Sequence, residues 1–194
     1  MLISGRVNSK NGEPISGALI EIKDESFQTI HQTLSDAQGN YSIDLPSGKY
    51  PFLTAVRDYG NKYLEYWCQN INLTQNLCLD IRFDTLEVYG LHAFNVKGAY
   101  PSLMLYFRPM SLEKFKSGNV DICPELKDVH VFIDSTEVSV LEQNKVLEFI
   151  GDRATGAYLL QVELPAGVLE WQRLDIEITD NSDSYGMATL FADQ

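Results

Sequence analysis

Cysteine is scarce in this sequence: the 194 residues include three, Cys68, Cys78 and Cys123. Three cysteines are too few for a disulfide scaffold, and no CxxC pair indicates a zinc or redox site. The spacing of Cys68 and Cys78 allows one disulfide across a hairpin, but we expect three buried thiols instead. A chain of this length buries roughly 70% of its extended surface, so it folds without covalent cross-links.

Basic residues and long apolar runs are also few. Fifteen Lys and Arg oppose 27 Asp and Glu, for a net charge of -12. Phosphates would be repelled, so neither nucleic acid nor an anionic membrane is an expected partner. No window reaches the roughly 20 apolar residues that cross a bilayer. Met1 leads directly into strand-like ISGRV rather than into a signal peptide, so the sequence as written predicts a soluble, cytoplasmic protein.

The sequence lacks the motifs of common catalytic sites. His31, His92 and His130 share no HxH or HxxxH spacing, and no GxSxG elbow is present. Residues 151–156, GDRATG, begin like a phosphate loop but lack the Lys and Ser/Thr that hold phosphate and magnesium. We expect a hairpin turn there. We predict no catalytic residues and no cofactor, and therefore no enzyme.

Short strands separated by turns fill the first 84 positions. Ala18, Ile20 and Ile22 alternate with more polar neighbours, which indicates a strand with one buried face. The best helical candidate in the chain, 111–116, is about one turn long and has no capping box. About seven strands with frequent turns are typical of a β-sandwich.

A second set of strand-like segments begins near Thr85. Its turns include Asp134-Ser135 and 165–167, and the linker 83–86 has no run of Gly, Pro or Ser. We predict an all-β protein of two packed β-sandwich domains, 1–84 and 85–194, each of about seven mainly antiparallel strands. The expected strands of the second domain are 86–94, 103–107, 129–134, 146–150, 158–164, 174–179 and 187–192.

Several turn and strand pieces of the first half occur in a fixed order. They are SGRV (4–7), NGEPI (11–15), GA (17–18), SDxxGxY (35–41) and LPxGxY (45–50). In this order they resemble the carboxypeptidase regulatory-like domain, a transthyretin-like β-sandwich, with Ser35 where the family usually has Thr. The family uses this domain as an accessory module without its own active site, so the resemblance implies a non-catalytic scaffold. Asp36 and Gly39 serve a turn, while Tyr41 and Tyr50 are expected buried anchors.

The second half more loosely resembles the immunoglobulin-like domains of bacterial surface proteins. The segments that carry this resemblance are 129–138, 164–167 and 174–181. It implies a bacterial surface or secreted assembly. Both resembled families are mostly extracytoplasmic, so the compartment stays open between this setting and the cytoplasm.

An aromatic segment, YGNKYLEYW (59–67), is the main candidate for binding. On a strand, Tyr63, Glu65 and Trp67 would share one face. We consider three alternatives for that face: interdomain packing, a protein or glycan surface, and ordinary core. The candidate partner-binding residues are Tyr59, Tyr63, Trp67 and Trp171.

Oxygen-bearing side chains gather in one loop near the end of the sequence. Asp180, Ser182 and Asp183 are weak calcium candidates, because hard cations prefer oxygen ligands. No Glu follows at the twelfth EF-hand position, and we favour a solvated turn.

The sequence therefore favours a non-catalytic binding or structural module that presents loops and a strand face to a protein or glycan. An edge strand could also add a partner strand. The alternatives are a carbohydrate-binding accessory protein and, least favoured, a hydrolase that uses surface carboxylates. The oligomeric state is left open.

Overall fold

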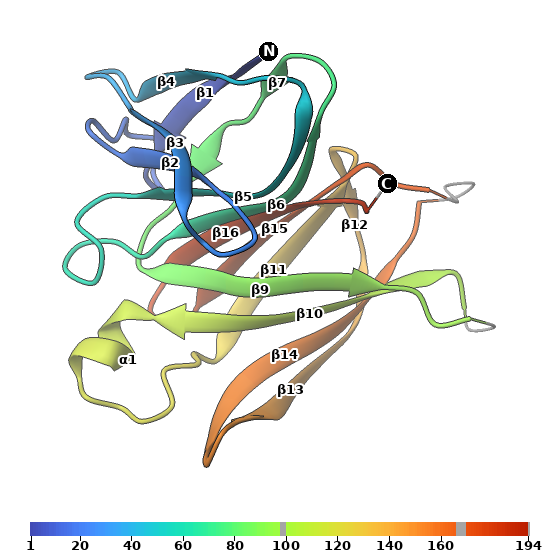
Figure 1. Cartoon of the computed structure of the whole chain (residues 1–194). Coiled ribbons are helices and arrows are strands. Elements are labelled where there is room, and N and C mark those ends of the chain that lie inside the picture. The colour runs from blue at the N-terminus through green and yellow to red at the C-terminus, as the bar shows by residue number, and fades with distance from the viewer. Residues whose placement is uncertain (98–99, 166–169, 194) are drawn as a thin grey trace.

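The computed structural model describes residues 1–97, 100–165 and 170–193 (Figure 1). A turn was expected at 165–167, and the motif 164–167 overlaps it. Ala166 and Gly167, which belong to both, lie outside the described residues. The all-β prediction is confirmed. The short helix α1 (Leu112–Lys116) is capped by Ser111, whose side chain accepts a hydrogen bond from the Lys114 amide. Within the described ranges, no helix has the length and apolarity of a membrane span.

The first half of the chain forms eight of the described strands. They are β1 (Leu2–Asn8), β2 (Leu19–Lys23), β3 (Thr29–Leu34), β4 (Asn40–Asp44), β5 (Gly48–Val56), β6 (Tyr66–Leu73), β7 (Leu77–Cys78) and β8 (Ile81–Arg82). The second half forms β9 (Leu86–Phe94), β10 (Ser102–Ser111), β11 (Leu126–Ile133), β12 (Thr136–Val138), β13 (Val140–Ile150), β14 (Arg153–Glu163), β15 (Arg173–Asp180) and β16 (Tyr185–Phe191).

One sheet runs through both halves of the chain. In the described residues its strand order is β12-β11-β15-β16-β6-β5-β2-β3, and it is continuous because β16 pairs in parallel with β6. Figure 1 shows the late strands β15 and β16 beside the early strand β6. On one side of this sheet lie β4, β1, β7 and β8, and the remaining sheet has the order β13-β14-β10-β9. Most pairings are antiparallel; β1 with β7 and β8, and β16 with β6, are parallel.

Two hydrophobic cores lie on the shared sheet. The first is formed mainly by residues before 84 but includes Tyr185 and Met187 of β16. The second is formed mainly by later residues but includes Trp67 of β6. The division of the chain into two domains at residue 84 stays a prediction, because strands of both halves share one sheet and each core includes residues of the other half.

Turn chemistry of the first half agrees with the sequence expectations. Asp36 Oδ1 accepts hydrogen bonds from the amides of Gln38 and Asn40, and Gly39 has a φ of 81°. The buried anchors reach backbone carbonyls, since the Tyr41 hydroxyl donates to Leu79 at 2.6 Å. The Tyr50 hydroxyl likewise donates to Pro46 at 2.9 Å. Residues 151–152 form the expected turn between β13 and β14.

Some expectations need correction. All three cysteines are free, but Cys78 is exposed rather than buried, because β7 has only two residues and turns Leu77 toward the core instead. The strand expected from Tyr63 begins at Tyr66, after the loop that contains the Tyr59–Tyr63 bridge. The strand expected at 146–150 extends back to Val140, since polar residues on an outer strand need no burial.

Candidate functional site: two adjoining hollows on strands β5 and β6

On strands β5 and β6, the alternation of inward-facing and outward-facing side chains is broken at one point. In the first core, Tyr50 and Leu53 of β5, like Cys68 and Ile71 of β6, are spaced by three residues rather than by two. Asn70 lies between the latter two with a φ of 62°. The alternation of buried and outward side chains therefore shifts by one residue on both strands.

An aromatic hollow of about 300 Å³ lies beside this shift, where the two halves of the chain meet. We name it the aromatic hollow. Its lining comes from the β2–β3 turn, β5, β6, β9, β10 and β13, and consists of Phe27, Phe52, Trp67, Gln69, Tyr89, Gly90, His92, Tyr106, Arg108 and Glu148.

The rings of the aromatic hollow contact one another in series. Phe27 stacks on Phe52 with ring centroids 4.5 Å apart. Trp67 meets Phe52 edge-to-face at 6.2 Å and Tyr89 edge-to-face at 5.3 Å. Such geometries are the preferred ones for aromatic pairs, so the rings hold each other in fixed orientations.

Phe27 reaches its stack through an unusual backbone. Its φ is 60°, a region that costs a bulky residue free energy, and its side chain stays 45% exposed. Asp24 holds the turn, because Asp24 Oδ1 accepts hydrogen bonds from the amides of Ser26 and Gln28. A strained, half-exposed aromatic ring is what a binding surface needs and a core does not.

The rest of the lining of the aromatic hollow is mostly polar. The Arg108 guanidinium lies 4.7 Å from the centroid of the Tyr89 ring, and its Nε is 3.2 Å from Glu148 Oε2. The Tyr106 hydroxyl donates to the same carboxylate, and burial together with Glu148 raises the pKa of Tyr106 to about 12. The hollow thus joins an apolar wall to a fixed array of donors and acceptors.

A buried carboxyl supports the aromatic wall from behind. Glu87 of β9 accepts hydrogen bonds from Trp67 Nε1 at 2.8 Å, from the Tyr59 hydroxyl at 3.3 Å and from the Glu65 amide at 3.3 Å. Burial raises the pKa of Glu87 to about 7 despite these bonds, and burial also raises the pKa of Glu65. Glu87 orients Trp67 but does not line the hollow.

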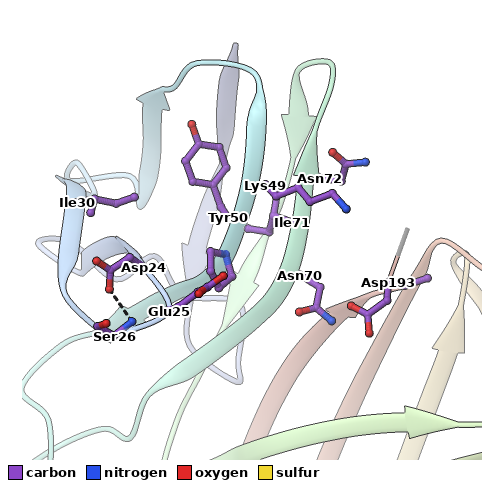
Figure 2. A pocket seen from close by; sticks show the side chains of 12 residues that line it. Asp24, Glu25, Ser26, Ile30, Lys49, Tyr50, Asn70, Ile71, Asn72 and Asp193 are labelled. Carbon is purple, nitrogen blue, oxygen red and sulfur yellow. Dashed lines mark hydrogen bonds between the residues drawn. The ribbon is translucent and has the colours of Figure 1, made fainter.

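A larger hollow, of about 580 Å³, adjoins the first, and we name it the polar hollow (Figure 2). Figure 2 shows Asn70 beside Asp193, with Asp24, Glu25 and Ser26 of the β2–β3 turn on the other side of the view. Its lining residues are Asp24, Glu25, Ser26, Ile30, Lys49, Tyr50, Pro51, Asn70, Ile71, Asn72, Ala192 and Asp193.

Comparison with known proteins bears on the first half. Residues 2–66 match the family model of the carboxypeptidase regulatory-like domain. The match confirms the resemblance predicted from the turn motifs. The match ends at Tyr66, the first residue of β6, so the rest of β6 lies beyond the matched residues. No curated protein matches the sequence.

Solved structures share only a distant likeness. BcpA, the major pilin subunit of Bacillus cereus, is 13% identical over 97% of this chain and 67% of its own, with a TM-score of 0.34. A DUF3823 family protein from Parabacteroides merdae is 14% identical over 97% of both chains, with a TM-score of 0.32. One from Bacteroides ovatus is 13% identical over 98% of both chains, with a TM-score of 0.32. Scores this low give no basis for transferring a function.

Of the predicted partner-binding residues, Tyr59, Tyr63 and Trp67 lie near the end of the matched residues 2–66, and the four residues do not form one site. Tyr59 and Trp67 meet on Glu87, and Trp67 is 8% exposed, so its ring belongs mainly to the packing between the halves. Tyr63 packs edge-to-face on Phe83, and Trp171 packs half-buried against the second core.

Sequence reasoning missed most of the aromatic hollow. Phe27, Phe52 and Tyr89 belong to separate elements and converge only in the folded chain. The one available signal was Phe27, an aromatic residue in the middle of the polar turn DESFQ. An exposed aromatic residue in such a turn indicates a surface role.

The calcium candidates lie in a turn in which one side chain accepts hydrogen bonds from backbone amides of the same turn. Asp180 Oδ1 accepts hydrogen bonds from the amides of Ser182 and Ser184, while Asp183 pairs with Lys127 at 3.1 Å. Over the described part of the chain, no three His, Cys, Asp or Glu side chains converge as metal ligands would. His31, His92 and His130 lie on the separate strands β3, β9 and β11.

Proposed function

We propose that this protein is a non-catalytic binding module that takes a glycan in the aromatic hollow. The observation that carries the proposal is the composition of that hollow: contacting rings of Phe27, Phe52, Trp67 and Tyr89 face a polar side. A sugar ring presents a C–H face, which packs on aromatic rings, and hydroxyls, which bond to fixed polar groups.

The size and polarity of the hollow favour a glycan over a protein surface. A volume of about 300 Å³ lies at the lower end of the range for small-molecule sites. A stable protein interface buries on the order of 800 Å² on each partner, mostly over convex or flat surfaces. Gln69, Arg108 and Glu148 provide both donors and acceptors within the hollow, as hydroxyl groups require.

The arrangement of the carboxylates supports binding without turnover. Glycoside hydrolysis ordinarily uses two carboxyl groups that flank the scissile bond. Among the residues that line the aromatic hollow, Glu148 is the carboxylate, and Arg108 and Tyr106 already hold it. Glu87 lies behind Trp67, away from a ligand. The match of residues 2–66 to a regulatory-like domain also fits a non-catalytic module.

The surface-associated setting remains part of the proposal. The resemblance of both halves to modules of extracytoplasmic proteins supports it, and a glycan ligand would be abundant there. Expression of the natural gene followed by fractionation of the cells tests this part separately from ligand binding.

A glycan array tests the ligand class. Labelled wild-type protein should bind a defined subset of neutral glycans, and Phe27→Gly should lose that binding. Glycine accepts the φ of 60° without strain, so this variant removes the ring and keeps the fold. Phe115→Ala is the matched control, because Phe115 is also exposed but lies on α1, outside the hollow.

Two results would overturn the proposal. One is an array on which no glycan binds above background. The other is equal binding by wild type and Phe27→Gly, which would move the site elsewhere. Incubating a bound glycan with the protein and recovering it uncleaved checks the absence of catalysis, whereas a shortened product would identify a hydrolase.

A further inference from the structure

We infer that the polar hollow is a second subsite of the same groove, so that the ligand is a neutral oligosaccharide lying along β5 and β6. This inference rests on the proposed function and extends it. It assigns a role to the larger hollow of Figure 2 and fixes the length and charge of the ligand.

The two hollows are lined by neighbouring residues of the same pair of strands. On β5, Phe52 lines the aromatic hollow and the preceding Pro51 lines the polar hollow. On β6, Gln69 lines the first and the following Asn70 lines the second. Phe52 and Gln69 are paired across the two strands, so both strands pass from one hollow to the other at the same point.

The β2–β3 turn borders both hollows. Phe27 lines the aromatic hollow, while Asp24, Glu25 and Ser26 line the polar hollow. From Gln69 to Asn72 the strand advances roughly 10 Å, at about 3.3 Å per residue. More than one sugar ring is needed to occupy both hollows at once, which points to an oligosaccharide.

Asn70 lines the polar hollow and has a backbone conformation that costs free energy. A φ of 62° inside a strand costs a residue other than glycine roughly 1 kcal/mol. Asn tolerates this conformation better than most residues, and a strained residue at a hollow is a reason to look for a function. Its amide carries two donors and one acceptor oxygen, which can bond to neighbouring hydroxyls of a sugar.

Charge selects a neutral ligand. Asp24, Glu25 and Asp193 line the polar hollow with a single cation, Lys49, in the same lining. The whole chain adds a net charge of -12. A uronic or sialic acid would be repelled, whereas hydroxyl groups donate well to carboxylates.

Calorimetry with a length series tests the inference. The probes are neutral glucose and mannose oligosaccharides, from the monosaccharide upward, titrated into the whole chain. We expect the longer members to bind the wild type about tenfold more tightly than the monosaccharide, a gain of about 1.4 kcal/mol. Asn70→Gly should remove this gain and leave the monosaccharide affinity unchanged.

The variants are chosen to fold. Glycine adopts a positive φ readily, so Asn70→Gly relieves strain while it removes the amide. Asn144→Ala is the matched control, because Asn144 is exposed on β13 and lines neither hollow. It should keep the full gain with chain length. A sialylated oligosaccharide of equal length should bind more weakly than the neutral one.

The outcomes separate this inference from the proposed function. If Phe27→Gly loses all binding but Asn70→Gly keeps the gain with length, the aromatic hollow binds sugar and the second subsite is wrong. An equal loss for all lengths in Asn70→Gly would also overturn it, because Asn70 would then serve the first subsite. If no glycan binds on the array and no member of the series binds the wild type, both proposals fail together.

Discussion

Trp67 donates its indole N–H to Glu87 Oε1 at 2.8 Å, across the boundary predicted at residue 84. The Glu87 carboxyl is buried and also accepts a hydrogen bond from the Tyr59 hydroxyl. One side chain from the second half thus orients the ring that forms part of the aromatic hollow.

Glu87 should make stability depend on pH. Its pKa rises from 4.5 to about 7 in the folded protein, because burial disfavours the charged form. The folded state therefore holds a proton that the unfolded state releases between these pH values, and the free energy of unfolding should fall as pH rises through this window. The expected loss is about 3 kcal/mol by pH 8. Urea denaturation across pH 4 to 8, at about one-unit intervals, measures it.

Glu87→Gln isolates this effect. The glutamine keeps an acceptor for Trp67 and carries no charge, so the variant should be more stable than wild type at pH 8 and should lose this part of the pH dependence. Glu13→Gln, at an exposed position, should follow the wild-type profile. Parallel profiles for wild type and Glu87→Gln would show that folding does not shift the pKa of Glu87.

Thr189 links the two halves within the shared sheet. Its buried hydroxyl accepts from Tyr66 at 2.7 Å and donates to Asp175 Oδ1 at 2.5 Å. Thr189→Val keeps the shape but leaves two buried polar groups without this partner, so we expect a loss of about 3 kcal/mol. Thr136→Val, exposed on β12, should change stability by less than about 0.5 kcal/mol. Thermal unfolding of both variants measures the difference, and equal melting temperatures would contradict the network.

Thiol labelling should distinguish the three cysteines. Cys78 is exposed, while Cys68 and Cys123 are buried. Burial raises the pKa of Cys123 to about 11 and that of Cys68 well above its ordinary value, so neither forms the reactive thiolate readily. A disulfide-exchange reagent should label one thiol in the native protein and three in denaturant. Cys78→Ser should leave none reactive in the native state, and fast labelling of that variant would refute this placement.

Gly39 should tolerate alanine less well than Gly12. Both have positive φ, 81° and 79°. A Cβ on Gly39 would lie 2.5 Å from the Val7 carbonyl oxygen, whereas one on Gly12 would meet nothing within 4 Å. We expect Gly12→Ala to cost about 1 kcal/mol from backbone strain alone, and Gly39→Ala at least about 2 kcal/mol more. Chemical denaturation of the pair tests this, and similar costs would mean that the turn relaxes.

Local patterns predicted the local structure well. Ala18, Ile20 and Ile22 are fully buried, as their alternation indicated, and Asp36 and Gly39 form the expected turn. These features depend on neighbours within a few residues, which the sequence displays directly. The order of turn motifs also identified the regulatory-like domain.

Features that depend on distant residues were not predictable in this way. The alternation of buried and outward side chains on β6 shifts at Asn70, and the strand begins at Tyr66 rather than at Tyr63. Both features depart from the period of two that was used to predict which side chains share a face. The partner of Trp67 is Glu87, on another strand. No local pattern specifies that contact, so the aromatic hollow could not be found from the sequence.

The parallel pairing of β6 with β16 has a consequence for the order of assembly. Trp67 lies opposite Ala188, and Cys68 opposite Thr189, so this edge of β6 must wait for residues made much later in synthesis. Contacts between such distant segments form slowly and leave a strand edge open meanwhile. A nascent chain that ends after residue 84 should therefore need protection from aggregation. The aromatic hollow, which both halves line, should form only when the second half docks.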